Sequence, residues 1–244
     1  MPTASLAPGH VQANLVVLPE TDARDFETLC ARNPQPLPLL EKTVAGSSAT
    51  LRVAADADLQ TDLPKYRVYL NGALSEERTD LTGIWQSDWV GFLLGCSFTF
   101  DALLVSAGLR VAHLETQRNV PMYITNQMLS PSGPMRGPLV VSMRPVHPSN
   151  LDRVVELTTS IPLAHGAPIQ IGDPEGLGID LDKPDFGDPP AIQTDEQPVF
   201  WACGVTSQAV ALQSQLPWMV THAPGHMFVT DLHVSDLIGL DSLA

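Results

Sequence analysis

The sequence is poor in charge. Only 16% of its 244 residues are Asp, Glu, Lys or Arg, whereas ~25% is typical of soluble domains. The balance is acidic, with 27 acidic side chains against 13 basic ones and a net charge of −14. This charge excludes nucleic acid and anionic lipid as partners that bind through bulk charge. The hydrophobic content of 44% excludes a disordered chain.

Long apolar runs and cysteines are also scarce. No stretch of eighteen apolar residues occurs, so no transmembrane helix is expected. The first residues have neither the basic nor the apolar region of a signal peptide. The three cysteines, Cys30, Cys96 and Cys203, are an odd number without the spacing of a disulfide framework. We therefore expect a cytoplasmic protein without membrane contact.

Common cofactor and metal motifs are absent. The sequence contains no phosphate-binding or dinucleotide-binding glycine loop, no H-E-x-x-H and no paired C-x-x-C. Residues 95–99 begin like a nucleophile elbow but lack its final glycine. We expect no cofactor and no metal. The alternative is a zinc site of His222 and His226, four residues apart, with Asp231 or Asp173 as a further ligand.

Proline and glycine are plentiful, with 22 and 17 residues. Proline breaks helix interiors, which excludes a bundle of long helices. The apolar pattern predicts helices over residues 22–32, 85–94, 102–107, 149–160 and 206–213, and strands over 14–18, 66–70, 139–143, 168–172, 199–203 and 218–221. In the second half, two strand–helix–strand units predict parallel pairing and an α/β sheet.

One long segment carries half of the net charge. Residues 173–197 hold eight acidic residues and one lysine, together with several prolines. A solvated loop is the simpler interpretation. A connection of this length favours a functional lid or a link between lobes.

Polar residues follow the predicted strands of the second half. In open α/β sheets, ligands bind at the carboxyl ends of strands, so these residues are expected to share one crevice. Arg144 would capture a carboxylate through its planar guanidinium. Cys203 precedes a helix, whose N-terminus lowers a thiol pKa, although a buried free cysteine is commonly only apolar packing. The predicted catalytic residues are His222, His226, Cys203 and Asp173, with Thr206 as a binding residue.

A second polar group occupies residues 118–126. Its fixed polar side chains could donate to a carboxylate or an oxyanion. Turn chemistry explains the asparagines equally well. The predicted substrate-binding residues here are Arg118, Asn119, Tyr123 and Asn126.

Several long motifs occur in order along nearly the whole chain, and together they resemble the D-glutamate cyclase family. The motifs are Thr61-Asp62-Leu63-Pro64-Lys65-Tyr66-Arg67-Val68-Tyr69, Gly95-Cys96-Ser97-Phe98-Thr99-Phe100, Asn119-Val120-Pro121-Met122-Tyr123, Gly137-Pro138-Leu139-Val140-Val141-Ser142-Met143-Arg144-Pro145, His165-Gly166-Ala167-Pro168, Lys183-Pro184-Asp185-Phe186-Gly187-Asp188, Trp201-Ala202-Cys203-Gly204-Val205-Thr206 and Thr221-His222-Ala223-Pro224-Gly225-His226.

The resemblance implies a hydro-lyase that converts D-glutamate to 5-oxo-D-proline and water. It also implies a two-lobed α/β fold with a larger three-layer lobe and a smaller α+β lobe. We expect residues 1–115 with 198–244 in the larger lobe and 116–197 in the smaller one. The expected partner is a small carboxylate substrate, with a possible homodimer. Two alternatives stay open: a cofactor-independent racemase or epimerase that uses Cys96 and Cys203 as opposed acid and base, and a non-enzymatic protein that binds small acids.

Overall fold

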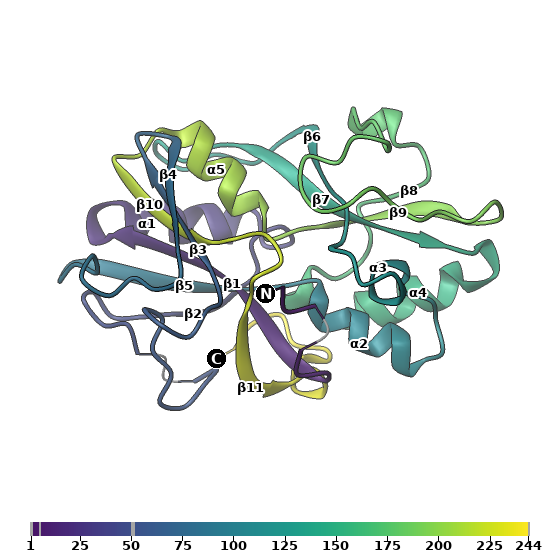
Figure 1. Cartoon of the computed structure of the whole chain (residues 1–244), viewed down its shortest axis with the longest axis horizontal. Helices are drawn as coiled ribbons and strands as arrows, with labels where there is room; N and C mark the ends of the chain where they lie inside the picture. The colour runs from purple at the N-terminus through teal and green to yellow at the C-terminus, as the bar shows by residue number, and fades with distance from the viewer. Residues whose placement is uncertain (1, 5, 50–51, 244) are drawn as a thin grey trace.

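The computed structural model of the protein describes residues 2–4, 6–49 and 52–243. Within these ranges the chain is an α/β protein with two sheets that lie side by side (Figure 1). The α/β class predicted from the sequence is therefore confirmed. The first sheet is built from β1 (His10–Pro19), β2 (Leu39–Lys42), β3 (Tyr66–Leu70), β4 (Ala73–Arg78), β5 (Trp89–Gly95), β10 (Trp218–His222) and β11 (Phe228–His233).

The second sheet takes its strands from the middle of the chain, in the order β6-β7-β9-β8. These are β6 (Met122–Met128), β7 (Pro138–Val146), β8 (Gln170–Ile171) and β9 (Gln197–Ala202). The helices are α1 (Glu20–Arg32), α2 (Phe98–Ser106), α3 (Ala112–Glu115), α4 (Leu151–Thr159) and α5 (Thr206–Ser214). Figure 1 shows α2, α3 and α4 on the side of the second sheet, and α5 near β10.

The prediction of parallel pairing is wrong for the described residues, whose ladders are all antiparallel. β7 and β8 do run in the same direction, but β9 lies between them and pairs with both. The second unit, β9-α5-β10, crosses from one sheet to the other. A strand–helix–strand order therefore does not by itself make two strands neighbours.

Two further elements differ from their prediction. Residues 85–94 do not form a helix, because they lead into β5, which is buried along its whole length. A short apolar run that is buried on all sides does not reveal its period. The strand predicted to end before Arg144 continues through Val146, with Pro145 opposite Pro198.

One hydrophobic core joins the two sheets. It contains Leu15 and Val68 from the first sheet, Val199 and Trp201 from the second, and Phe100 from α2. The division into lobes at 115 and 198 stays a prediction, but the pairing of β9 with β7 places residues 197–202 with the second sheet. Side chains between the two sheets are thus held from both sides.

Candidate active site

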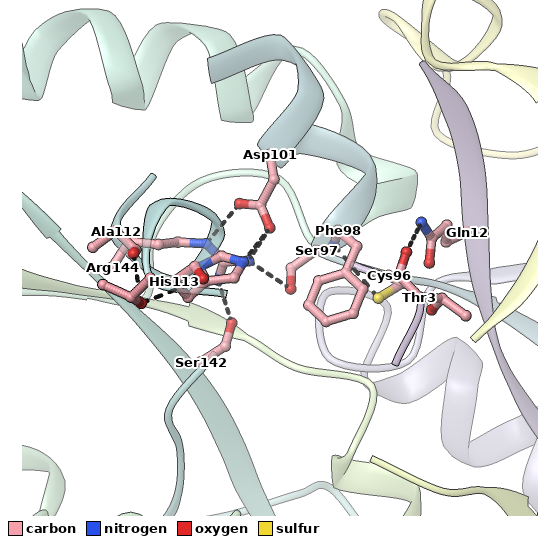
Figure 2. Close-up of polar contacts among 11 residues, drawn as sticks. Thr3, Gln12, Cys96, Ser97, Phe98, Asp101, Ala112, His113, Ser142 and Arg144 are labelled. Atoms are coloured by element: carbon pink, nitrogen blue, oxygen red, sulfur yellow. Dashed lines mark hydrogen bonds and ion pairs between the residues drawn. The ribbon is translucent and has the colours of Figure 1, made fainter. Parts of the chain in front are cut away.

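Arg144 is the centre of a buried polar network (Figure 2). It lies on β7 and is 1% exposed. Its Nε and Nη2 atoms donate to the two carboxylate oxygens of Asp101 on α2, at 2.8 and 2.9 Å. Nη1 donates to Ser142 at 2.7 Å, and Nη2 also donates to Ser97 at 3.1 Å. Because the planar guanidinium is matched by a carboxylate of the chain itself, its geometry is fixed before any ligand arrives.

Asp101 connects this network to an imidazole. His113, on α3, places Nε2 3.2 Å from Oδ2 of Asp101. Burial would raise the pKa of the Asp101 carboxyl, but the Arg144 guanidinium and His113 outweigh it and lower the pKa to about 2. Asp101 is therefore ionised at neutral pH. This short distance to a carboxylate makes His113 a candidate for proton transfer.

His113 lines a small hollow at the edge of this network. Arg118 and Asn119 line it too, and Pro189 and Pro190 are part of its wall. The hollow measures about 10 Å³, which is room for about one water molecule. Arg118 is exposed, whereas the Oδ1 atom of Asn119 is buried without a hydrogen-bond partner among the described residues. A buried acceptor without a partner is costly, so this oxygen is a candidate to receive a ligand's N–H group. The Asn119 side chain packs beside Gly225, where an added Cβ atom would lie 3.0 Å from Oδ1.

Two thiols lie behind the network. Cys96 and Cys203 directly follow β5 and β9, strands of different sheets, and belong to the same small apolar cluster. Burial raises the pKa of both thiols, that of Cys203 to about 11. Both are therefore protonated at neutral pH, and neither is a ready nucleophile.

The predicted histidines lie apart from this hollow. His222 is fully buried on β10, where its Nδ1 is 3.3 Å from the carbonyl oxygen of Leu15, and burial lowers its pKa to about 4. His226 is partly buried, and its Nδ1 lies 2.9 Å from the carbonyl oxygen of Pro224. Burial lowers the pKa of His226 as well. Both rings are therefore mainly neutral at pH 7.

The other predicted residues have structural contacts. Asp173 is exposed and accepts a hydrogen bond from the Gly176 amide, while Asn126 donates to the Gly176 carbonyl. The Tyr123 hydroxyl donates to the Leu181 carbonyl. Thr206 bonds both backbone groups of Val140 and so ties α5 to β7. The roles assigned to these residues stay predictions.

The polar residues that were expected to meet in a crevice at the carboxyl ends of the strands do not all lie together. Neighbouring antiparallel strands end at opposite edges of a sheet. The structure brings Arg144 near Cys203 through Ser142, and Arg118 beside Asn119. It leaves Asp173 on an exposed turn.

Four residues of the network were missed by sequence reasoning: Ser97, Asp101, His113 and Ser142. Two signals could have found some of them. Ser97 belongs to the 95–100 motif that carries the family resemblance, and Asp101 directly follows it. No comparable signal marks His113, which sits in a short helix between two turns.

A much larger groove lies elsewhere. It measures about 1040 Å³ and is bounded by α1, β2 and residues 162–167. Of the polar residues considered in the sequence, it contains only His165, which is fully buried with Nδ1 2.8 Å from the Gln35 carbonyl oxygen. Size alone does not make this groove the reactive site, because no described residue with a predicted catalytic or binding role lines it.

Metal ligands are not clustered in the described ranges. No group of three or more His, Cys, Asp or Glu side chains is placed to hold a metal ion there. Among the helices of the same ranges, none has the length and apolar character that a membrane crossing needs.

Comparison with known proteins identifies the relatives of this chain. A protein of Rubrobacter xylanophilus named "Putative hydro-lyase" is 59% identical over 94% of this chain and 89% of its own length. A similarly named protein of Geobacillus kaustophilus is 55% identical over 97% of this chain and 90% of its own length. A nitrogen repressor-like protein of Methanococcus jannaschii covers 93% of this chain and 86% of its own, but at 12% identity and a TM-score of 0.42 this likeness carries no argument.

The family profile described as D-glutamate cyclase matches residues 90–231. This range includes most of β5, the buried network around Arg144, the 173–197 segment and most of β11. The chain therefore belongs to the D-glutamate cyclase family.

Proposed function

We propose that this protein is a hydro-lyase that closes D-glutamate to 5-oxo-D-proline with loss of water. The observation that carries the proposal is that His113, Arg118 and Asn119 line one hollow beside the pair of Asp101 and Arg144. The hollow now has room for about one water molecule, so its wall must open to admit glutamate. Family membership gives the class of reaction. The residues of the hollow supply a cation, an amide and an oriented imidazole for it.

The reaction requires two protons to move from the substrate's ammonium group to one oxygen of its side-chain carboxylate. The amine nitrogen attacks the carboxyl carbon, the carbon–nitrogen bond forms, and the carbon–oxygen bond breaks to release water. His113 would take a proton from nitrogen and return it to the leaving oxygen. Asp101 would hold the imidazole in position through both steps.

Binding would use the other two residues of the hollow. Arg118 would hold a substrate carboxylate, and Oδ1 of Asn119 would accept an N–H of the substrate amine. This differs from the sequence-based proposal, in which Arg144 binds the carboxylate and His222 or His226 moves the proton. Arg144 is now assigned a positioning role because Asp101, Ser97 and Ser142 already occupy its donors.

The test is to incubate the purified protein with D-glutamate or L-glutamate and to measure 5-oxoproline by chiral liquid chromatography and mass spectrometry. We expect product from the D enantiomer. His113→Gln should lower kcat by about 100-fold or more, as for the loss of a general acid–base. His233→Asn is the control. His233 is exposed and caps the short helical turn Val234–Leu237, outside the hollow, and asparagine is also a good capping residue.

Each outcome decides a different part of the proposal. Full turnover by His113→Gln together with loss in His222→Gln would restore the sequence-based assignment. Turnover of other amino or hydroxy acids, but not glutamate, would replace the substrate. Saturable binding of glutamate without any product would favour a binding protein.

A second candidate is supported by the two thiols in one buried cluster. A racemase that uses Cys96 and Cys203 would exchange the substrate's α-hydrogen with solvent. Glutamate incubated in D₂O would then gain deuterium at its α-carbon, and Cys203→Ser would abolish the exchange. An unlabelled α-carbon would exclude this reaction for glutamate.

A further inference from the structure

The hollow at His113 has a neighbour. A cavity of about 190 Å³ lies on the other side of Pro145, which lines both spaces. Arg110 lines this second cavity, and one segment covers both: Pro189 and Pro190 border the hollow, while Asp195 and Glu196 border the cavity. The two spaces therefore share one covering segment, and Pro145 of β7 lies between them.

The covering segment is held at two ends, and Asp195 near the second end also lies 3.4 Å from Nε2 of His147. At one end, Asp188 accepts from the Asn119 amide at 2.7 Å and donates back to the Asn119 carbonyl at 3.2 Å. At the other end, Glu196 accepts from the Gln193 amide at 2.9 Å. Residues 189–192 make no hydrogen bond to any other described residue. Such a span can move without breaking a ladder of bonds.

The second end is anchored by a carboxylate on Arg110. The Nη1 atom of Arg110 lies 2.8 Å from both side-chain oxygens of Glu196, and this glutamate side chain is only 4% exposed. Glu115 binds Nε of the same guanidinium at 2.9 Å, but its side chain is 56% exposed. A shielded carboxylate on an arginine beside a cavity has the chemistry of a bound acidic ligand.

We propose that Arg110 is a substrate-binding residue, and that Glu196 occupies the place of one carboxylate of a dicarboxylic amino acid. The proposal rests on the proposed function, because it assumes that the substrate enters at His113. When residues 189–196 lift, the hollow and the cavity open to each other over Pro145, with Arg118 lining one side and Arg110 the other. A substrate with two carboxylates would be held at both ends, and Glu196 would leave Arg110.

Glutarate is the probe, because it carries the two carboxylates of glutamate but no amine and cannot react. Its affinity is measured by isothermal titration calorimetry with the full chain. Glu196→Gln keeps an oxygen for the Gln193 amide but removes the competing charge. We expect it to tighten glutarate binding by about tenfold, since it relieves competition for the binding-competent state. Arg110→Gln should weaken glutarate binding by about tenfold or more.

Glu115→Gln is the matched control, because it removes the same charge from the same guanidinium at an exposed position. Unchanged glutarate affinity in Glu115→Gln, with tighter binding in Glu196→Gln, supports the proposal. Equal effects of both variants, or no effect of Glu196→Gln, overturn it. Butyrate, with one carboxylate, should bind Glu196→Gln more weakly than glutarate does, because it can occupy only one of the two arginines.

The calorimetry separates this inference from the proposed reaction. Glutarate binding that depends on Arg110 and Glu196, without any 5-oxoproline from D-glutamate, leaves the carboxylate site standing and refutes the cyclase. Turnover of D-glutamate that is unaffected in KM by Arg110→Gln keeps the cyclase and refutes this site. Thermal unfolding of each variant shows that it is folded at the assay temperature.

Discussion

Buried charge in this protein is matched residue by residue. Arg144 is enclosed by Asp101, two hydroxyls and the rings of Phe100 and Trp201, whose centroids lie 4.7 and 5.7 Å from the guanidinium carbon. Each polar contact satisfies a donor that burial would otherwise leave costly. Cation–π contact with two rings adds to the same enclosure. A network of this kind holds α2 and β7 in one relative position.

His222 gives the clearest prediction from a single residue. Burial lowers its pKa to about 4 from an ordinary 6.5. Between these values the unfolded chain binds a proton that the folded chain does not, so stability falls as the pH drops from 6.5 towards 4. Between pH 6.5 and 5, the free energy of unfolding should therefore fall by about 1 to 2 kcal/mol less in His222→Gln than in the wild type.

Urea denaturation of both proteins at the two pH values measures the effect. His165, whose pKa burial also lowers to about 4, is present in both proteins and cancels in the comparison. Parallel stability curves for wild type and His222→Gln would show that His222 is not neutral in the folded state.

Residue identities could be predicted from the sequence better than their partners. Arg144 was predicted to follow an apolar strand and to capture a ligand's carboxylate, but it lies within β7 and its partner is the carboxylate of Asp101, 43 positions earlier. Sequence spacing carries no information about such a pair, because packing of α2 against the second sheet creates it. Arg118 and Asn119 were predicted to bind substrate because polar residues are dense in their short segment; both line the hollow, and their binding role stays a prediction.

Elements were predicted well where their period or their ends are marked. α1, β3, β10 and α5 match their predicted ranges closely, since polar residues, turns or caps bound them. β5 failed because all seven of its residues are buried, so neither helical nor strand periodicity is visible. The prediction of parallel pairing was wrong for a different reason. A helix between two strands favours a parallel arrangement only when both strands belong to the same sheet.

Gly204 shows how closely two elements meet. It follows β9, and a Cβ atom at this position would lie 1.9 Å from Nδ2 of Asn14 on β1. That amide also donates to the Gly95 carbonyl at 2.5 Å, so it cannot move freely. Gly204→Ala should lower the free energy of unfolding by about 1 to 3 kcal/mol, as overpacking does.

A double-mutant cycle with Asn14→Ala checks this prediction by urea denaturation. Removing the Asn14 amide leaves room for the new methyl group, so the cost of Gly204→Ala should shrink in the Asn14→Ala background. Strictly additive effects would mean that the two side chains do not compete for space.

At the scale of the whole molecule, the chain returns to its first sheet after building the second. β10 pairs with both β1 and β3, and β11 pairs with β1, so the last strands close the sheet that the first strands began. The common core around Phe100 and Trp201 connects this sheet to its neighbour. The two sheets are thus joined by covalent crossings and by packing, while the ion pair of Asp101 with Arg144 fixes α2 on the second sheet.

The acidic segment that covers the candidate site also sets the long-range field there. Residues 173–197 carry a net −7 of the total −14, and an anionic substrate must approach through this field. Salt screens repulsion between exposed charges over ~10 Å at 0.1 M. We therefore expect kcat/KM for D-glutamate to rise as NaCl is raised from low to moderate concentration, in contrast to enzymes that attract their substrates by charge. Initial rates over a series of NaCl concentrations measure this dependence. The acidic segment would then slow the association of the enzyme with its anionic substrate by charge repulsion.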